Sequence, residues 1–203
     1  MNPQYLKNDE INKIKEIYAQ KPDAVVAFPT DTVWGVGCLP MNEKGVKNIY
    51  ALKGREEEKP LILLSSNIKH LKPFVEKIPP KALALINKYL PGALTLIIKK
   101  STLTPDFMTS GFDSVGIRIP NHPVFCEFLE CCVPGSVLAT TSANLSGEAS
   151  GTNKEEVIAS IGKNMDYILD DFGIAAEGHA STVVLIQDDG NIKVLRQGSV
   201  IVE

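Results

Sequence analysis

Short apolar runs alternate along the chain with segments whose apolar residues recur at helical spacing. The runs predict strands at 24–28, 61–64, 93–98, 114–119, 137–139, 167–169, 182–186 and 192–195. The helical spacing predicts helices between residues 9 and 22 and over about 43–52, 80–90, 124–132 and 152–161, with a shorter one at 68–74. The first strand, the helix after it and the strand at 61–64 have βαβ order. We therefore expect an α/β fold.

Several polar residues mark where these elements begin. Asn8 and Asp9 can cap the first helix, and Thr152 with Glu155 has the spacing of a capping box.

Residues 101–113 show no periodicity and contain Pro, Gly and hydroxyl side chains. We expect this segment to be either a mobile loop near the functional site or a plain connector.

Composition adds limits on size and environment. The chain has 203 residues, 44% of them hydrophobic, which suits one sizeable core. We expect a single domain over residues 9–199 with no second domain. No apolar run is long enough to span a bilayer, so we expect a cytoplasmic protein with no membrane contact.

Charge and cysteine spacing exclude further classes of protein. A net charge of -3 argues against a protein that coats nucleic acid by charge alone, so any RNA contact should be local. Neither a C-x-x-C pair nor a histidine-rich partner segment accompanies the four cysteines, which predicts reduced thiols and no zinc site. The sequence also lacks a Walker-type phosphate loop, and its three histidines lie in no motif typical of a nucleophile or metal ligand.

Two predicted strands lead directly into segments rich in hydroxyl groups. The first is followed by Thr30 and Thr32, with Gly35 and Gly37 just beyond, and the strand at 137–139 is followed by 140–144. Loops after strands are where open α/β sheets bind ligands, and glycines let the backbone approach a small polar molecule. The alternative is a capped turn in which the hydroxyls bond only to local backbone groups.

Cations gather in the segment between the second helix and the strand at 61–64. Lys53, Arg55 and Lys59 suit a polyphosphate, because lysine and the fork-shaped arginine both bind phosphate oxygens. Glu56, Glu57 and Glu58 lie between them, however, so a solvated turn is the alternative.

A further arginine stands inside a predicted strand. Arg118 lies in an otherwise apolar run, and a buried guanidinium needs an anion beside it. That anion is either a ligand or an internal carboxylate.

Near the end of the chain, Asp189-Gly190 predicts a tight hairpin turn, which brings Ser181 and Arg196 to the same end of two paired strands.

Five segments together resemble the YrdC family, which comprises the threonylcarbamoyl-AMP synthases. They are PTDTVWGVG at 29–37, KGREEEKPL at 53–61, VGIRIPNHP at 115–123, TTSANLSG at 140–147 and STVV at 181–184. The likeness covers nearly the whole chain in order. It implies a single-domain, twisted, open mixed sheet flanked by helices with a ligand cleft. The chain corresponds to the short form of the family.

The resemblance also implies the reaction and its participants. L-threonine, bicarbonate and ATP would give threonylcarbamoyl-AMP and pyrophosphate, for the threonylcarbamoyladenosine modification of tRNA. A divalent metal, expected to be magnesium, would accompany ATP, and threonylcarbamoyl-transfer proteins would act downstream, with local tRNA contact. Such a protein positions the reactants and neutralises developing phosphate charge instead of supplying a covalent residue.

The resemblance also implies a role for individual residues within the motifs. The resemblance assigns threonine binding to Thr32, Arg118, Thr140 and Ser181. It assigns ATP binding to Arg55, Lys59, Ser114, Ser142, Asn144, Ser150 and Arg196. Lys53 and Arg55 are the expected catalytic cations, and no metal ligand is identified.

Two departures and two alternatives accompany this assignment. Trp34 replaces the more usual tyrosine, and Lys59 stands where some relatives have asparagine.

A noncatalytic paralogue that binds RNA or nucleotide through the same cleft is the first alternative, and retention of Lys53, Arg55, Ser142 and Asn144 favours the enzyme over it. The related domain of hydrogenase-maturation carbamoyltransferases is the second, but it normally sits in a much longer chain with zinc-finger-like cysteines.

Overall fold

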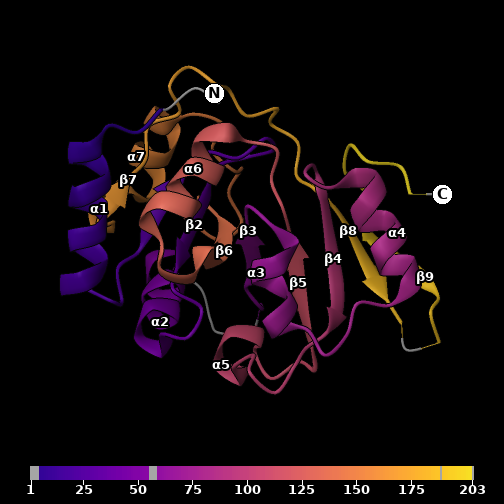
Figure 1. The fold of residues 1–203 in the computed structure, drawn as a ribbon. Coiled ribbons are helices and arrows are strands. Elements are labelled where there is room, and N and C mark those ends of the chain that lie inside the picture. Colours follow the sequence, from indigo (N-terminus) through magenta and orange to yellow (C-terminus); the bar gives the residue numbers. More distant parts are fainter. Residues whose placement is uncertain (1–4, 55–58, 188, 203) are drawn as a thin grey trace.

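The architecture was obtained as a computed structural model that describes residues 5–54, 59–187 and 189–202 (Figure 1). In this part of the chain, nine strands form one sheet in the order β7-β1-β2-β6-β3-β5-β4-β8-β9. The strands are β1 Val26–Phe28, β2 Gly35–Cys38, β3 Ile62–Ser65, β4 Leu94–Lys99, β5 Ser114–Arg118, β6 Val137–Ser142, β7 Tyr167–Ile168, β8 Thr182–Ile186 and β9 Ile192–Arg196.

The first helix precedes the first strand, and the other helices lie in the connections between strands. They are α1 Asn8–Gln20, α2 Glu43–Leu52, α3 Ile68–Leu71, α4 Pro80–Tyr89, α5 Asp106–Thr109, α6 Pro123–Cys132 and α7 Lys154–Ile161. Three short 3-10 helices cover Lys72–Phe74, Pro134–Ser136 and Gly162–Asn164. The mixed α/β fold predicted from the sequence is confirmed. Over the described residues, no helix combines the length and apolar character that crossing a bilayer requires.

The sheet is mixed, and its directions correct one expectation. Strand β1 pairs antiparallel with β2, β2 with β6, and β6 with β3, whereas β3 pairs parallel with β5 and β4 with β8. The βαβ unit is therefore β2-α2-β3, with β6 inserted between its strands, and not a unit that starts at β1. Because β1 and β6 run in the same direction, their carboxyl ends meet at one edge of the sheet.

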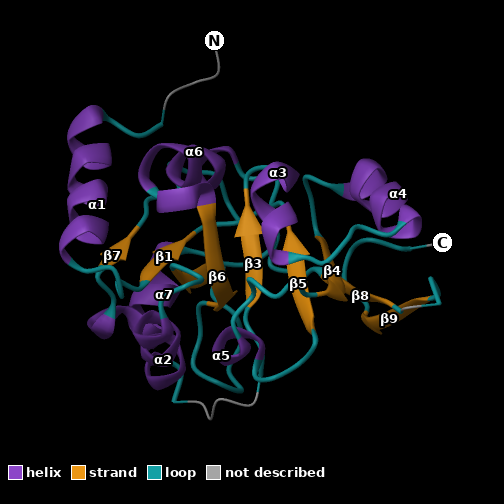
Figure 2. Ribbon diagram, turned by 60° about the horizontal axis from the view of Figure 1, so that its bottom comes forward, coloured by secondary structure: helices purple, strands orange, loops and turns teal. Residues whose placement is uncertain are grey.

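Helices cover the two faces of the sheet with separate apolar cores (Figure 2). On one face, Phe28 stacks against Phe125 of α6 with ring centroids 4.4 Å apart, and Tyr18 of α1 joins the same cluster. On the other face, Ile49 of α2 and Val157 of α7 belong to a larger cluster. Figure 2 shows α1 and α6 on one side of the sheet and α2 and α7 on the other.

Several element boundaries differ from the predicted ones. Residues 35–38, expected in a loop, form β2, and β6 continues to Ser142 because these two strands pair with each other. Lys7 is the N-cap of α1 and makes no side-chain capping bond, so Asn8 and Asp9 begin the helix instead of capping it. The cap of α7 is Asn153, whose side chain accepts from the Glu156 amide, one residue beyond the predicted pair.

The segment at 101–113 does not lie at the site. It contains α5, and Leu61 donates a backbone hydrogen bond to the carbonyl of the fully buried Met108. The hydroxyl of Thr104 donates to the carbonyl of Phe74 at 2.5 Å. None of its residues lines the cavity described below. The connector interpretation is therefore the correct one.

The hairpin at the end of the sheet has its strands where the sequence predicts them, but its connection is longer than a two-residue turn at Asp189-Gly190. Ile186 pairs with Ile192, and the Gln187 amide donates to the carbonyl of Asn191. Gly190 lies in the turn with φ 79° and donates to the carbonyl of Gln187. The connection thus has more than two residues, although it still brings β8 and β9 into antiparallel pairing.

Candidate functional site

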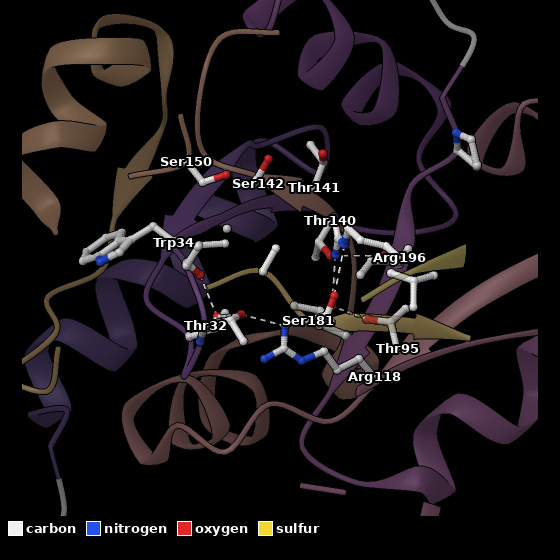
Figure 3. Close-up of a pocket in the computed structure, with 18 residues that line it drawn as sticks. Thr32, Trp34, Thr95, Arg118, Thr140, Thr141, Ser142, Ser150, Ser181 and Arg196 are labelled. Carbon is white, nitrogen blue, oxygen red and sulfur yellow. Dashed lines mark hydrogen bonds between the residues drawn. The ribbon is translucent and has the colours of Figure 1, made fainter. Parts of the chain in front are cut away.

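A cavity of about 230 Å³ lies over one face of the central strands (Figure 3). Its floor comes from Ile62 and Leu64 of β3, Thr140 of β6, Arg118 of β5 and Thr95 of β4. The pairing register places these residues on the same face, since Ile62 is opposite Thr140 and Leu64 is opposite Arg118. The cavity therefore extends from the edge of the sheet onto its face. Ligand pockets typically measure roughly 300–1,000 Å³, so this one is suited to a small molecule.

Arg118 is buried in the floor and holds three acceptors. Its Nε donates to the carbonyl of Gly92 at 2.9 Å, Nη1 to the Thr32 hydroxyl at 2.8 Å, and Nη2 to Asp31 Oδ1 at 2.5 Å. Only 5% of Arg118 is exposed. Both sequence-based interpretations of Arg118 therefore hold in part, because it forms an internal ion pair with Asp31 and also lines the cavity.

Burial and charge act on this guanidinium in opposite directions. Desolvation lowers the pKa of Arg118, and the nearby positive charge of Arg196 lowers it further, while Asp31 and Glu177 raise it. Two arginines thus lie close enough to repel each other across the cavity. An anionic ligand between them would relieve that repulsion.

The two threonines after β1 have different roles. The Thr30 hydroxyl donates to the carbonyl of Val33 at 2.6 Å and accepts from the Thr32 amide at 3.2 Å. The capped-turn alternative therefore describes Thr30. Thr32, in contrast, accepts from Arg118, and its hydroxyl lies 3.1 Å from that of Thr30. Arg118 is the last residue of β5. Because Thr32 bonds to Arg118, the loop after β1 must lie over the face of the sheet.

A second hydrogen-bonded group closes the opposite wall. The hydroxyls of Ser181 and Thr95 are 2.8 Å apart, and Arg196 donates to the Ser181 hydroxyl at 3.2 Å and to its carbonyl at 3.0 Å. Ser181 and Arg196 both line the cavity, as the hairpin argument predicts. Ser181 is buried, but Arg196 is exposed, and partial desolvation lowers the pKa of its guanidinium.

The end of β6 supplies further hydroxyls. Ser142 and Ser150 line the cavity, and the Ser150 hydroxyl donates to Asn144 Oδ1 at 3.4 Å. Asn144 is buried, and its amide nitrogen donates to the carbonyls of Leu145 and Glu148, both at 2.8 Å. Asn144 thus fixes the turn after β6 and does not line the cavity.

Lys53 is not in a polar loop, and that expectation is wrong. It is 3% exposed at the C-terminal end of α2, and its Nζ donates to the carbonyls of Ser142 at 2.5 Å and Asn144 at 2.6 Å. Each contact is charge-assisted, and together they join α2 to the end of β6. Lys53 therefore positions the Ser142 segment from behind the cavity.

The remaining predicted residues differ in whether they line the cavity. Arg55 falls outside the described residues. Lys59 is exposed, with its carbonyl accepting from the Tyr50 hydroxyl at 3.1 Å, while its neighbour Pro60 lines the cavity. Ser114 begins β5 opposite Lys99 and is absent from the lining. Thr140 does line the cavity, and its hydroxyl donates to the carbonyl of Ile62 at 3.1 Å.

The sequence did not indicate that Asp31, Thr95 and several apolar residues would contribute to the site. Asp31 stands within the PTDTVWGVG segment, but its partner on β5 becomes visible only with the fold. Thr95 lies in a run that reads simply as a buried strand, although a hydroxyl inside such a run is itself a usable signal. Ile62, Leu64 and Val183 supply the apolar part of the wall.

The site combines two cations with hydroxyl groups, and the described residues of its lining include no carboxylate. Among the residues that the structure describes, no three His, Cys, Asp or Glu side chains gather as a metal cluster would require. The arrangement can bind an anion at Arg118, hold a small polar molecule against Thr32, Thr140 and Ser181, and accept a second anion at the exposed Arg196.

Comparison with known proteins identifies relatives over most of the chain. The family model Sua5_yciO_yrdC, described as "Telomere recombination", matches residues 19–198. Threonylcarbamoyl-AMP synthase of Bacillus subtilis is 38% identical over 89% of this chain and 51% of the relative. A putative threonylcarbamoyl-AMP synthase of Methanocaldococcus jannaschii is 34% identical over 95% of this chain and 89% of the relative.

A solved structure gives the same picture in three dimensions. P. abyssi Sua5 complexed with L-threonine superposes with a TM-score of 0.86 at 31% identity, covering 96% of this chain and 56% of that one. The chain thus spans about half the length of the B. subtilis and P. abyssi proteins, but most of the length of the M. jannaschii protein.

Proposed function

Because the chain belongs to the Sua5_yciO_yrdC family, we propose that it is an L-threonylcarbamoyladenylate synthase. It forms threonylcarbamoyl-AMP and pyrophosphate from L-threonine, bicarbonate and ATP, and so acts as a nucleotidyltransferase. The membership confirms the resemblance seen in the sequence motifs. Curated relatives that bear the synthase name, and a solved relative complexed with L-threonine, support the proposed substrate.

The observation that carries the proposal is Arg118 in the floor of a small cavity lined with hydroxyl groups. A free amino acid presents a carboxylate, which suits a guanidinium in a desolvated site. The hydroxyls of Thr32, Thr140 and Ser181 suit the polar side chain of threonine, and Ile62 and Leu64 provide apolar surface for its methyl group. The cavity volume is appropriate for this substrate, with the larger nucleotide at the open side.

The chemistry needs no covalent residue from the protein. Bicarbonate takes up a proton and loses water to give carbon dioxide, and the amine of threonine attacks the carbon dioxide and loses a proton, which leaves a carbamate. A carbamate oxygen then attacks the α-phosphorus of ATP, the bond from that phosphorus to the bridging oxygen of the β-phosphate breaks, and pyrophosphate leaves. What the chain contributes is alignment of the carbamate with the phosphate and compensation of charge on the phosphate oxygens.

Residues on the open side of the cavity suit the nucleotide. Arg196 is exposed there and can pair with phosphate oxygens, while the Ser142 and Ser150 hydroxyls can donate hydrogen bonds. Lys53 contributes indirectly, because its side chain holds the backbone of Ser142 and does not line the cavity. Arg55 remains assigned to ATP by the motif alone.

Magnesium would enter with the nucleotide. Over residues 5–54, 59–187 and 189–202 the lining offers hydroxyl groups and no carboxylate, so these residues would hold the ion through the ATP phosphates and water, a common arrangement for this cation. Bound there, it would neutralise phosphate charge. The residues around it would keep the carbamate in line with the α-phosphorus.

An omission experiment tests the proposal. Pyrophosphate release is measured with ATP, threonine and bicarbonate together, and then with each one left out. The proposal expects release only when all three are present, and release that is independent of threonine would overturn it.

A noncatalytic paralogue that binds RNA or nucleotide is the alternative that the same experiment addresses. Lys53 and Asn144 were expected to favour the enzyme, but both use their side chains inside the protein. Their presence therefore fits either function, and the measured chemistry must separate the two.

The product would pass to other components of the tRNA modification. A mixed anhydride of a carbamate and a phosphate is reactive, so we propose that a threonylcarbamoyl-transfer protein consumes it downstream, with local contact to tRNA. We also propose a cytoplasmic location, where ATP and tRNA are available.

A further inference from the structure

Asp31 stands directly behind the guanidinium that is proposed to hold the substrate carboxylate. The Asp31 side chain is 12% exposed, and its Oδ1 accepts from Arg118 Nη2 at 2.5 Å. It does not line the main cavity, whereas its neighbour Thr32 does. Asp31 instead faces a second hollow together with Gly92, His122 and Glu177. The Asp31–Arg118 pair therefore forms part of the wall between the two hollows.

The backbone around Asp31 is fixed independently of the ion pair. Glu177 donates its amide to the Asp31 carbonyl at 3.1 Å, and Gly178 donates to the Thr32 carbonyl at 2.8 Å. These two bonds tie the loop after β1 to the segment that precedes β8. The backbone that carries the Asp31 carboxylate is thus held in place by main-chain bonds, and the carboxylate itself is held by Arg118.

The fixed acceptors leave the guanidinium little freedom. An arginine side chain has five N–H groups, and Gly92, Thr32 and Asp31 occupy one each on three different nitrogens. Two N–H groups remain for a ligand. Asp31 and Thr32 lie on the loop after β1, and Gly92 lies just before β4, so acceptors from two separate segments define both the position and the plane of the guanidinium before any ligand arrives.

We infer that Asp31 is a positioning residue that orients Arg118 for the carboxylate of the amino-acid substrate. It acts through Arg118 and does not touch the substrate, and this inference rests on the proposed synthase function. Displacement of a binding group by about 1 Å can cost roughly 100-fold in rate, so losing the third acceptor should be costly even though a negative charge is removed.

The test compares Asp31→Ala with Asp31→Asn in the threonine-dependent pyrophosphate assay. For Asp31→Ala we expect kcat/KM for threonine to fall about tenfold or more, chiefly through KM, with the KM for ATP within about threefold of wild type. Asp31→Asn keeps an acceptor oxygen at the same place and should stay within about threefold of wild type. Asp31→Ser, whose hydroxyl is too short for the same bond, replaces Asp31→Ala if the alanine variant does not fold.

Two controls separate positioning from charge and from folding. Glu177→Gln removes a nearby carboxylate that is not among the three acceptors of Arg118, and it should leave the threonine KM unchanged. In an Arg118→Gln background, Asp31→Ala should add almost nothing, because its effect passes through the arginine.

The outcomes distinguish this inference from the proposed function. Wild-type protein without threonine-dependent pyrophosphate release overturns both. An active wild type overturns only the inference if Asp31→Ala leaves the threonine KM unchanged, raises the KM for both substrates equally, or adds its full effect in the Arg118→Gln background.

Discussion

At the scale of single residues, Arg118 carries the most weight in the proposed recognition. Replacing it with glutamine keeps a hydrogen-bond donor but removes the charge, and hydrogen bonds to charged groups contribute about 1.5–3 kcal/mol. We predict that Arg118→Gln weakens threonine binding about tenfold or more while ATP affinity changes less. Isothermal titration of each ligand measures this, and a selective loss of ATP affinity would assign Arg118 to the triphosphate.

Lys53 shows how a motif residue can serve the site without lining it. Lys53→Met keeps much of the apolar stem but leaves two buried carbonyl oxygens without their donor, which should cost about 1–3 kcal/mol of the free energy of unfolding. Each kcal/mol lowers the melting temperature of a chain this long by roughly 2–4 °C. We predict that the melting temperature and the turnover number fall together.

The matched control for Lys53 is Lys44→Met, which removes an exposed lysine paired with Asp23 at 3.0 Å on the same helix. That change should alter stability and turnover much less than Lys53→Met, since the Lys44 side chain is exposed and the Asp23 carboxylate keeps its hydrogen bond from Asn48. A Lys53→Met protein with wild-type stability but no turnover would instead indicate direct contact with phosphate.

Substrate selectivity follows from the mixed lining of the cavity. Apolar contact with Ile62 or Leu64 should favour threonine over serine by roughly 1–3 kcal/mol in kcat/KM, the usual contribution of one methyl group. Valine has nearly the same shape as threonine but leaves the cavity hydroxyls without a partner, so it should be used poorly. Comparing kcat/KM for the three amino acids at saturating ATP and bicarbonate tests both parts. Equal use of valine would refute the hydroxyl contact, and equal use of serine would refute the methyl contact.

At the scale of elements, long periodic segments were predictable and the short glycine-rich strand was not. The helices α2, α4 and α6 follow the 3.6-residue spacing of their apolar residues, and the predicted ranges agree closely with the observed ones. Strand β2 has only four residues, two of them glycine, and glycine is a poor strand former. Its pairing with β1 and β6, which are distant in sequence from each other, is what makes it a strand.

The glycines of β2 make room for protein side chains and not only for a ligand. A Cβ on Gly35 would lie 2.5 Å from the Phe28 ring, and a Cβ on Gly37 would lie 2.9 Å from Thr140 Cγ2 and 3.0 Å from the Ala139 carbonyl. The expectation that these glycines serve close approach to a small molecule is therefore incomplete. They let the Phe28 ring and the Thr140 side chain pack against the strand.

We predict that Gly37→Ala lowers threonine affinity as well as stability. The added methyl must displace Thr140 or the backbone of β6, at a cost of about 1–3 kcal/mol for overpacking. Val36→Ala is the matched control, because Val36 is buried in the opposite core and its truncation should cost stability without moving Thr140. Threonine titration and thermal melts of both variants decide the matter. Equal threonine affinity in Gly37→Ala and wild type would contradict the prediction.

At the scale of the whole molecule, the sequence motifs located the site but not the contacts within it. Thr32, Arg118, Thr140 and Ser181 come from four separate segments, and all four line one cavity. Which of them touch depends on the register of strands that pair across the sheet. The local pattern does not specify that register, so neither the Asp31–Arg118 pair nor the burial of Lys53 could be derived from it.

The stability of the whole fold should depend on pH through His122. This residue caps α6, where its Nδ1 accepts from the Phe125 amide at 3.4 Å, and its Nε2 lies 3.3 Å from the Ile174 carbonyl. Burial lowers the pKa of His122, and a bond to the Ile174 carbonyl opposes this only in part. In the unfolded chain, His122 binds a proton once the pH falls below its ordinary pKa of about 6.5, whereas burial disfavours the protonated form in the folded chain. The free energy of unfolding therefore decreases as the pH drops below that value.

Melting temperatures between about pH 7.5 and 5.5 test this dependence. We predict that wild-type protein loses stability over this range and that His122→Asn, which can still cap the helix, loses less. His179→Asn is the control, because His179 is exposed and should leave the slope unchanged. An identical slope in wild type and His122→Asn would contradict the prediction.

The central claim is that this chain joins threonine, bicarbonate and ATP into one adenylate. The most direct measurement supplies isotopically labelled bicarbonate with threonine and ATP, and identifies the adenylate product by mass spectrometry. We expect a threonylcarbamoyl-AMP that retains the label and forms in equal amount with pyrophosphate. An unlabelled threonyl adenylate, or no adenylate at all, would contradict it.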